Sequence, residues 1–313
     1  MSNSSPASQT SNYIGRFAPS PTGALHAGSL LAAVASYLDA KSNQGKWLLR
    51  MEDLDPPREI AGAANQILQQ LNSLGLEWDG EVLYQSTRLD AYELILQQLS
   101  NKDLCYRCDC TRPQIRAMGN VYNGACRQRS NAPENEYAIR VKTADVDIGI
   151  DDLVQGHYQQ NIGKDIGDFV IRRKDRLFAY QLAVVVDDDY QKVTHIIRGF
   201  DLIDSTPRQI SLQRLLGFST PNYGHIPVII NDQGQKLSKQ HFAPAIDSNN
   251  ASQLIFLALQ ALGQSPPANS QQESAQDQLS WAIQHWDIQA VPKLANIPDT
   301  TIQDSTISDT TQI

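Results

Sequence analysis

Short apolar segments that read as β-strands alternate with helical segments through the N-terminal third of this chain of 313 residues. The strand segments are residues 13–18 and 46–51, and the helical segments are residues 24–40, 60–74 and 89–101. This order predicts an α/β fold, a doubly wound parallel sheet with helices on its faces. Ligands of such sheets bind at the carboxyl ends of the strands. The segments just after the first two strands, which include His26 and Arg50–Asp53, are therefore candidates for a binding site.

The alternation stops near residue 104 and returns near residue 169. Between these points, cysteines, short β-like runs and acidic turns indicate an insertion. Strand and helix segments then resume at residues 169–172, 180–186, 195–198, 207–216 and 226–230. We expect a disordered N-terminus (1–12), the first half of the α/β domain (13–103), the insertion (104–168), the second half (169–245), a short helical C-terminal region (246–296) and a disordered tail (297–313).

Composition excludes several classes of protein. Lys and Arg number 26 against 34 Asp and Glu, so a net charge of −8 excludes a histone-like protein that binds nucleic acid through bulk charge. The chain has no apolar run of the ~18–20 residues that a membrane helix needs, and its polar N-terminus lacks the apolar core of a secretory signal. We expect a cytoplasmic protein with no membrane partner and no evident obligatory protein partner.

Two segments carry groups that suit phosphates. Residues 16–29 pass from the first strand through a Pro- and Gly-rich loop into a helix with His26 and Gly28 in its first turn. A helix N-terminus attracts phosphate, Gly28 leaves room for a nucleotide, and His26 can donate a hydrogen bond to a phosphate oxygen. The second segment follows a strand and a Gly turn, and its Lys236 and Lys239 can stabilise charge on a transferring phosphoryl group. Together the two segments predict a nucleotide-binding domain.

The four cysteines of the chain lie at positions 105, 108, 110 and 126. Clustered cysteines in a protein without a secretory signal indicate a metal site rather than disulfides, and zinc is the default metal for thiolates. Cys108, Cys110 and Cys126 make a plausible set of three ligands. Cys105 would complete a four-cysteine site, but it sits in an apolar run where a cysteine behaves as a small hydrophobic residue.

The two phosphate segments resemble the signature motifs of class I aminoacyl-tRNA synthetases. His26–Ser29 resembles the HIGH motif and Lys236–Gln240 the KMSKS motif. Residues 16–23, 50–55, 180–188 and 193–199 resemble the glutamyl branch of this family, so the likeness extends over about residues 13–245. The resemblance implies a Rossmann-like catalytic domain with a zinc-containing insertion. It also implies a ligase that activates L-glutamate with ATP and Mg²⁺.

The resemblance also implies roles for individual residues. Glutamate binding falls to Arg16, Phe17, Ala18, Pro19, Ser20, Glu52, Tyr180 and Arg198. ATP binding falls to His26, Gly28, Ser29 and Lys239, and catalysis to His26, Lys236 and Lys239. The zinc ligands would be Cys108, Cys110, Tyr122 and Cys126, with Tyr122 in place of Cys105. The residue types suit the substrate, because arginine pairs with carboxylates and Glu52 can pair with the α-ammonium group.

Only residues 241–313 follow the second lysine segment, which is too little for the anticodon-reading domain of a full glutamyl-tRNA synthetase. In this respect the chain resembles the truncated paralogues that attach glutamate to the queuosine base at the wobble position of tRNA(Asp). An acidic protein needs a local basic surface for such an RNA. The candidates are Arg112, Arg116, Arg127, Arg129, Arg172, Arg173, Lys174 and Arg176.

Three other functions remain open at this point. One is a glutamyl-tRNA synthetase catalytic fragment that charges a tRNA 3′ end. Another is a zinc-dependent RNA-binding protein without catalysis, against which the presence of His26, Glu52, Lys236 and Lys239 argues. The last is a different nucleotidyltransferase, which would give no reason for the paired arginines and Glu52.

Overall fold

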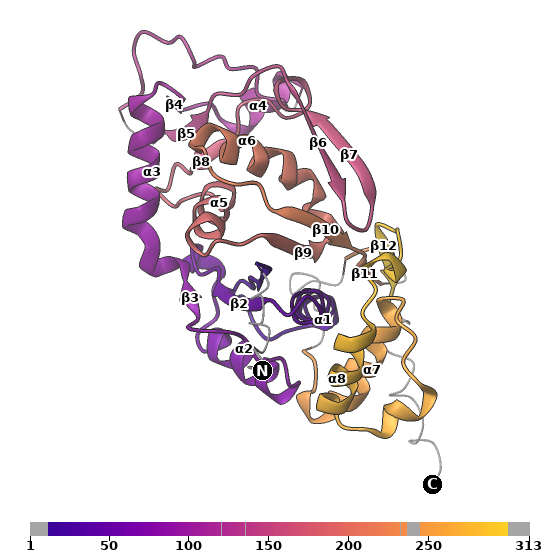
Figure 1. The fold of residues 1–313 in the computed structure, drawn as a ribbon. Coiled ribbons are helices and arrows are strands. Elements are labelled where there is room, and N and C mark those ends of the chain that lie inside the picture. Colours follow the sequence, from indigo (N-terminus) through magenta and orange to yellow (C-terminus); the bar gives the residue numbers. More distant parts are fainter. Residues whose placement is uncertain (1–11, 120, 135, 232, 237–244, 300–313) are drawn as a thin grey trace, which may run out of the picture.

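The computed structural model describes residues 12–119, 121–134, 136–231, 233–236 and 245–299 (Figure 1). The disorder that the sequence predicts for the N-terminus and for most of the C-terminal tail concerns residues outside these ranges, and Lys239 also lies outside them. No helix within the described ranges is long and apolar enough to cross a membrane.

A parallel sheet forms the centre of the molecule. Strands β1 (Ile14–Phe17), β2 (Lys46–Met51) and β3 (Leu83–Tyr84) pair in parallel, as do β9 (His195–Gly199) and β10 (Asn222–Ile226). The N–H of Thr194 donates to the carbonyl oxygen of Ile14 at 2.8 Å, which places β9 beside β1. The order is therefore β3-β2-β1-β9-β10. The chain moves outward from β1 in one direction and later returns to its other side, so the predicted doubly wound sheet is confirmed.

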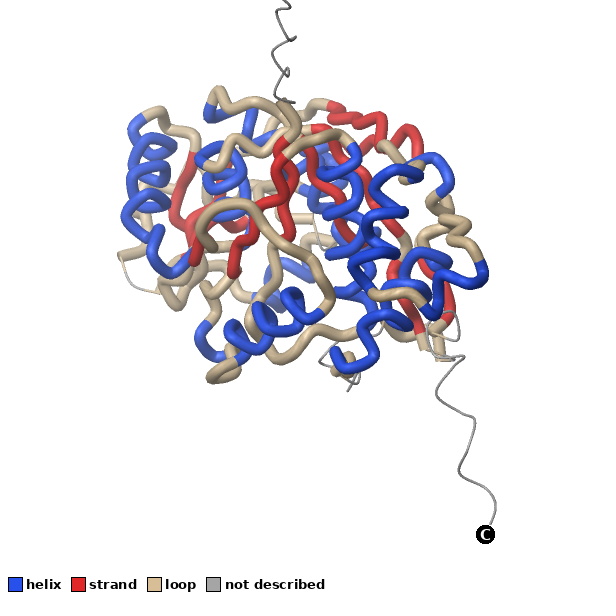
Figure 2. The backbone as a smooth tube through the Cα atoms, turned by 60° about the horizontal axis from the view of Figure 1, so that its bottom comes forward, coloured by secondary structure: helices blue, strands red, loops and turns tan. Residues whose placement is uncertain are grey.

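Helices cover both faces of this sheet (Figure 2). On one face lie α1 (Ala27–Ser42) and α2 (Ala63–Ser73), and on the other lie α3 (Leu89–Asn101), α5 (Tyr180–Tyr190) and α6 (Thr206–Leu216). Successive strand residues point to opposite faces, so buried Ile196 packs in the core of α3, α5 and α6, while Ile197 packs in the core of α1. Both faces of β9 are therefore buried, and this explains why its two successive residues Ile196 and Ile197 are both apolar.

The insertion contains two antiparallel sheets. Strands β4 (Cys105–Cys108), β5 (Ala138–Val141) and β8 (Val170–Arg172) form one, and β6 (Asp147–Asp152) and β7 (Gly156–Asn161) form a hairpin. A short helix, α4 (Arg112–Ala117), follows β4. The sequence segment 169–172 was expected to resume the α/β domain, yet its strand pairs with β5 and so completes the sheet of the insertion.

The C-terminal region packs on α1. Its helices are α7 (Ala251–Ala261) and α8 (Ala275–His285), and the indole N–H of Trp286 donates to Asp39 of α1 at 2.8 Å. Strand β12 (Asn296–Pro298) pairs in parallel with β11 (Val228–Ile230). The predicted strand 226–230 is therefore divided at Pro227, which has no N–H to donate, and the predicted tail begins inside a strand.

Gly263, which follows α7, provides a test of this packing. It adopts a φ of +72°, and a Cβ atom there would overlap the carbonyl oxygen of Ala290. Gly80 has nearly the same φ, +75°, with nothing within 4 Å of the added atom. Both Gly→Ala changes carry the left-handed backbone cost of about 1–2 kcal/mol. We expect Gly263→Ala to lower the free energy of unfolding by about 1–3 kcal/mol more than Gly80→Ala, from the clash. Equal losses in urea titrations would contradict this packing.

Candidate active site

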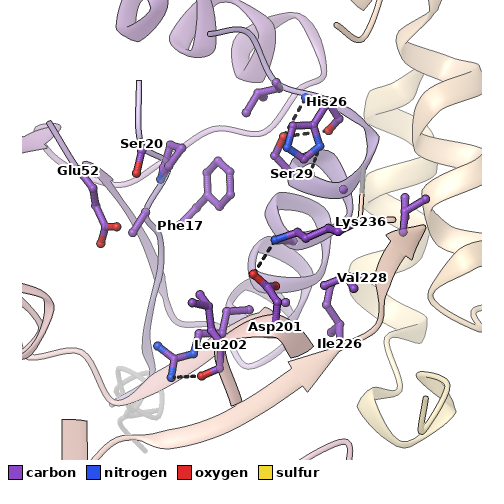
Figure 3. A pocket seen from close by; sticks show the side chains of 18 of the residues that line it. Phe17, Ser20, His26, Ser29, Glu52, Asp201, Leu202, Ile226, Val228 and Lys236 are labelled. Carbon is purple, nitrogen blue, oxygen red and sulfur yellow. Dashed lines mark hydrogen bonds and ion pairs between the residues drawn. The ribbon is translucent and has the colours of Figure 1, made fainter. Parts of the chain in front are cut away.

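A pocket of about 500 Å³ opens at the carboxyl ends of β1, β2 and β9 (Figure 3). This is the place where the chain order of the sheet reverses, as expected for a ligand site of a doubly wound sheet. The predicted site residues that line it are Arg16, Phe17, Ala18, Pro19, Ser20, His26, Gly28, Ser29, Glu52, Tyr180, Arg198 and Lys236. Figure 3 shows Glu52 and Ser20 at one side of the pocket, with His26, Ser29 and Lys236 at the other.

His26 is the N-cap of α1. Its Nδ1 accepts the backbone N–H of Ser29 at 3.3 Å, and the Ser29 hydroxyl accepts the N–H of His26 at 2.8 Å. Because Nδ1 is an acceptor, the neutral ring carries its proton on Nε2. The cap thus fixes a tautomer whose Nε2–H is a donor, next to a helix N-terminus that attracts anions.

Lys236 reaches the pocket from the segment after β11. Its ammonium group pairs with Asp201 at 2.5 Å, and both side chains are partly exposed. Asp201 follows β9, so this ion pair joins the lysine segment to the central sheet (Figure 3). A multiply charged anion in the pocket would compete with Asp201 for the lysine.

Glu52 supplies a carboxylate at the end of β2. Its Oε1 is buried and has no hydrogen-bond partner among the residues that the structure describes, although it lies 3.7 Å from Nη2 of Arg50. Burial raises the pKa of Glu52 to about 6, against the opposing effect of Arg50 and Arg16. A buried carboxylate without a donor costs free energy, so Glu52 is suited to receive the ammonium group of a ligand.

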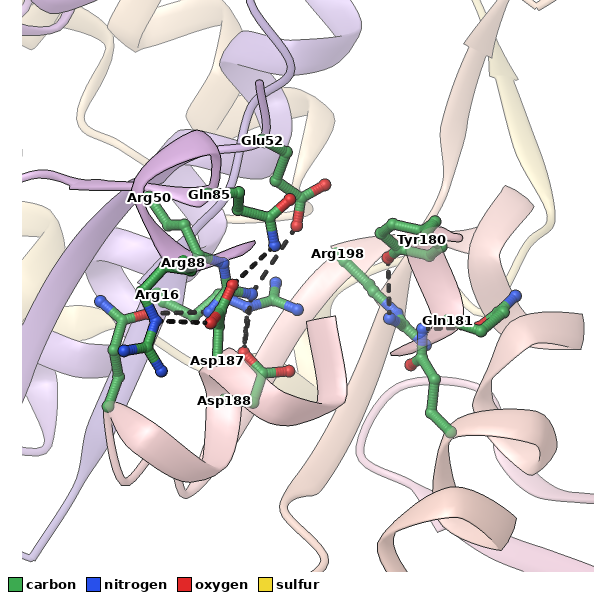
Figure 4. A network of polar contacts seen from close by, with 12 residues as sticks. Arg16, Arg50, Glu52, Gln85, Arg88, Tyr180, Gln181, Asp187, Asp188 and Arg198 are labelled. Atoms are coloured by element: carbon green, nitrogen blue, oxygen red, sulfur yellow. Dashed lines mark hydrogen bonds and ion pairs between the residues drawn. The ribbon is translucent and has the colours of Figure 1, made fainter. Parts of the chain in front are cut away.

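Asp188 of α5 holds two arginines from neighbouring strands. It accepts from Nε of Arg16 at 3.3 Å and from Nη2 of Arg50 at 2.8 Å (Figure 4). Burial opposes ionisation of this carboxyl group, but the two guanidinium groups hold its pKa below the usual range. Arg16 is tied through Nε, which leaves its terminal N–H groups as a fork for a carboxylate in the pocket.

Arg198 of β9 is held from several sides. Its Nε donates to His225 at 3.0 Å, its Nη2 to the hydroxyl of Thr206 at 2.8 Å, and its Nη1 to the hydroxyl of Tyr180 at 3.4 Å. Burial raises the pKa of Tyr180, so its hydroxyl stays protonated at neutral pH. Arg198 and Arg16 thus place two fixed cations near one buried carboxylate, Glu52.

A separate cluster in the insertion suits a metal ion. The sulfur atoms of Cys108, Cys110 and Cys126 all lie within 4.8 Å of one another. The hydroxyl of Tyr122 lies 3.4 Å from Sγ of Cys108 and 3.7 Å from Sγ of Cys110. Ligand atoms around a tetrahedral zinc stand about 3.5–3.8 Å apart, given the usual Zn–O and Zn–S distances. The separations of Tyr122 from Cys108 and Cys110, and the 3.6 Å between the sulfurs of Cys110 and Cys126, are close to these values, so the cluster suits zinc.

The surroundings of the cysteines differ. Burial would raise the pKa of the Cys108 thiol, but hydrogen bonds from Tyr122 and Arg140 outweigh it and lower that pKa. Cys105 instead packs in the core of α3 and α5, and burial raises the pKa of its thiol to about 11. The structure thus brings Tyr122 to the three clustered sulfurs and leaves Cys105 in a separate core.

Sequence reasoning missed several residues that build the pocket. It did not single out Asp188, Asp201, Thr206 or His225, and the partners of Asp188, Asp201 and His225 lie 27 or more residues away along the chain. The acidic run 187–189, near the end of an otherwise largely apolar helix, was a usable signal, because buried carboxylates require partners. His225 lies in a buried strand, and nothing local distinguishes it from an ordinary core residue.

Comparison with known proteins identifies the family. The profile described as tRNA synthetases class I (E and Q), catalytic domain, matches residues 14–271. A glutamyl-Q tRNA(Asp) synthetase of Pseudomonas aeruginosa is 49% identical over 93% of this chain and 99% of its own length. One of Pseudomonas syringae pv. tomato is 50% identical over 93% of this chain and 98% of its own length.

Solved structures agree with these sequence matches. A glutamate tRNA ligase of Elizabethkingia meningosepticum, crystallised with its amino acid, has a TM-score of 0.75 and 27% identity over 92% of this chain and 67% of its own. The glutamate-tRNA synthetase of Elizabethkingia anophelis has a TM-score of 0.77 and 26% identity over 93% and 69% of the two chains. The chain therefore belongs to the class I tRNA synthetases of the glutamyl and glutaminyl type, and within them to the glutamyl-Q tRNA(Asp) synthetase family.

Proposed function

We propose that this protein activates L-glutamate with ATP and transfers it to the queuosine base at the wobble position of tRNA(Asp). The observation that carries the first half is the buried carboxylate of Glu52, whose Oε1 has no hydrogen-bond partner among the described residues, in a pocket with two fixed arginines. Glutamate offers the matching charges, an ammonium group and two carboxylates. The relatives named glutamyl-Q tRNA(Asp) synthetase, matched over nearly their whole length, support the second half.

In the glutamate end of the pocket, each charge of the substrate has a counterpart. Glu52 would accept the α-ammonium, and Arg16 and Arg198 would bind the carboxylates. The segment Phe17–Ser20 would enclose the ligand, and the Tyr180 hydroxyl would help to orient it. Glutamine would present a neutral amide to an arginine, and aspartate would be short by one methylene group, so both are expected to bind less well.

At the other end, the residues suit a nucleoside triphosphate. His26 and the backbone at Gly28 would bind phosphates at the α1 N-terminus, where Ser29 completes the cap, and Lys236 and Lys239 would stabilise charge as pyrophosphate leaves. The α-carboxylate oxygen of glutamate forms a bond to the α-phosphorus, and the bond from that phosphorus to the bridging oxygen breaks. An acceptor hydroxyl on queuosine then attacks the acyl carbon and AMP leaves. Mg²⁺, held mostly by phosphates and water, would accompany ATP.

Zinc would be held by Cys108, Cys110, Tyr122 and Cys126 and would fix the loops around α4. Among the basic residues expected to meet RNA, Arg112, Arg116, Lys174 and Arg176 have no ion pair within the described part of the chain, and Lys174 donates to the carbonyl oxygen of Asp109. Arg112 and Arg116 are exposed on α4, beside the metal cluster. We infer that the insertion offers these side chains to the phosphates of the anticodon loop.

Glutamate affinity should depend on ionisation of Glu52. With a pKa raised to about 6, this carboxyl loses its charge as the pH falls through 6, so the Kd of glutamate should rise there. Calorimetric titration without ATP measures this Kd at each pH. The side-chain carboxyl of free glutamate has a lower pKa, near 4, so its own protonation is separate from that of Glu52. Glu52→Gln should weaken binding by about 10²-fold or more and flatten the profile. Glu59→Gln, a matched control outside the pocket, should behave as wild type. If the Kd of glutamate for the wild type stays constant from pH 5 to 8, the role of Glu52 is refuted.

Zinc retention should separate Tyr122 from Cys105. Purified protein should hold about one zinc. Tyr122→Phe removes an oxygen next to the sulfur cluster and should speed zinc loss during mild chelation, whereas Cys105→Ser should retain the metal. Elemental analysis after timed chelation measures both. The reverse order would show a four-cysteine site.

Labelled glutamate tests the RNA substrate. It should appear on tRNA from cells that make queuosine and be absent from tRNA of cells that cannot, because the proposed acceptor hydroxyl belongs to queuosine; a base in a loop is also accessible to a protein. Glutamate-dependent ATP–pyrophosphate exchange is the control for the first step. Equal labelling of both tRNA pools would instead indicate charging of a 3′ end, and absence of exchange would refute glutamate activation.

A further inference from the structure

His225 lies in β10, fully buried, with one ring nitrogen toward Arg198 and the other toward Asp152. We propose that Asp152 and His225 are positioning residues that orient Arg198 for a carboxylate of glutamate, an inference that rests on the proposed function. Neither residue lines the pocket, and neither belongs to the sequence segments that resemble the synthetase motifs.

The contacts form a chain of buried groups. Nε of Arg198 lies 3.0 Å from Nε2 of His225, and Nδ1 of His225 lies 2.5 Å from Oδ2 of Asp152. The side chains of His225 and Asp152 are both 0% exposed. Thr206 closes the arrangement, since its hydroxyl lies 3.2 Å from Nε2 of His225 and accepts from Nη2 of Arg198 at 2.8 Å.

The protons in this chain can be assigned from chemistry alone. A guanidinium group only donates, so Nε2 of His225 must accept the Nε–H of Arg198. His225 is then neutral, with its proton on Nδ1, and that proton is donated to Asp152. An ionised Asp152 can only accept hydrogen bonds, and it therefore selects the tautomer that Arg198 requires.

The charges around His225 are consistent with this assignment. Burial lowers the pKa of His225, Arg198 lowers it further, and Asp152 and Asp201 oppose them. Burial alone would raise the pKa of Asp152, yet its hydrogen bonds with His225 and with backbone N–H groups keep it low. A neutral imidazole between a guanidinium and a carboxylate satisfies every donor and acceptor without placing two positive charges together.

The consequence for Arg198 is a fixed orientation. Nε is held by His225 and Nη2 by Thr206 and the carbonyl oxygen of Leu202, so the guanidinium cannot rotate without breaking buried hydrogen bonds. Nη1 contacts the hydroxyl of Tyr180 (Figure 4), and both of these residues line the pocket. A ligand carboxylate then meets a preorganised donor and loses little affinity to side-chain ordering.

Asp152 comes from the insertion, at the end of β6. Its Oδ1 accepts the backbone N–H groups of Val154, Gln155 and His225, and the N–H of Leu153 donates to Tyr223 of β10 at 2.8 Å. The hairpin of β6 and β7 is thereby attached to the central sheet at Tyr223, two residues before His225. Through this contact, the insertion reaches the glutamate end of the pocket.

Asp152→Asn tests the proton assignment with little change of shape. Asn can keep Oδ1 for the three backbone N–H groups, but it puts an NH₂ group where Oδ2 accepts from His225. The ring must then accept on Nδ1 and carry its proton on Nε2, where it opposes the Nε–H of Arg198. The KM for glutamate in pyrophosphate exchange should rise about 10- to 100-fold, the usual scale for a hydrogen bond to a charged group. The KM for ATP should stay within about twofold.

Asp151→Asn is the matched control. Asp151 neighbours Asp152 and also pairs with a histidine, His157 at 2.8 Å, but that pair is exposed. The Asp151→Asn variant should leave both KM values unchanged.

His225→Gln should keep most of the affinity for glutamate, since its amide oxygen can accept from Arg198. Adding Asp152→Asn to that variant should change the affinity little, because glutamine has no tautomer. Nitrogen-15 NMR of the ring should show Nδ1–H in the wild type and Nε2–H in Asp152→Asn.

The outcomes distinguish this inference from the proposed function. If wild-type protein shows no glutamate-dependent exchange, the proposed function fails. If the wild type is active but Asp152→Asn matches Asp151→Asn, or raises the KM values for glutamate and ATP equally, the positioning role is refuted. The same conclusion holds if the wild-type ring carries its proton on Nε2, or if Asp152→Asn is as harmful with glutamine at position 225 as with histidine.

Discussion

The buried carboxylate of Asp188 is the constraint on which the glutamate end of the pocket depends. Arg16 and Arg50 lie on adjacent strands, and both guanidinium groups are removed from water. Two buried cations without a shared anion would cost several kcal/mol each. Asp188 offsets that cost, and because it belongs to α5 it also joins the second half of the domain to the first two strands.

One carboxylate, Asp188, does not neutralise the arginines of this region, and Glu52 adds a second anion that can meet the ammonium group of a ligand. Arg16, Arg50 and Arg198 lie close to Asp188 and Glu52, and Asp152 reaches Arg198 only through His225. Glutamate, with one net negative charge, adds an anion next to three arginines. A carboxylate ligand is thus favoured by local charge even though the whole chain carries −8.

The fold was predictable because the strands are short, apolar and separated by helices with clear periodicity. β2 and α3 have the bounds that the sequence predicts, and the segments after β1 and β2 lead into the pocket as expected. β8 was misplaced because an isolated run such as 169–172 carries no signal about its partner strand. Likewise, the His225–Arg198 contact depends on the pairing of β10 with β9, which is a property of the assembled sheet. Local patterns identify chemically capable residues but not the groups that orient them.

The two ends of the pocket differ in how firmly their cations are held. The side chain of Lys236 is 42% exposed and has one ion pair, with an exposed aspartate, whereas Arg198 is 4% exposed and bonded through each of its nitrogen atoms. A rigid cation suits selection, because a wrong side chain cannot induce it to move and leaves its donor unpaired. A more exposed lysine suits an anion whose charge is redistributed during the reaction, since the ammonium group can follow the departing phosphates. In the proposed function, buried arginines recognise the amino acid and a lysine at the surface handles the phosphates.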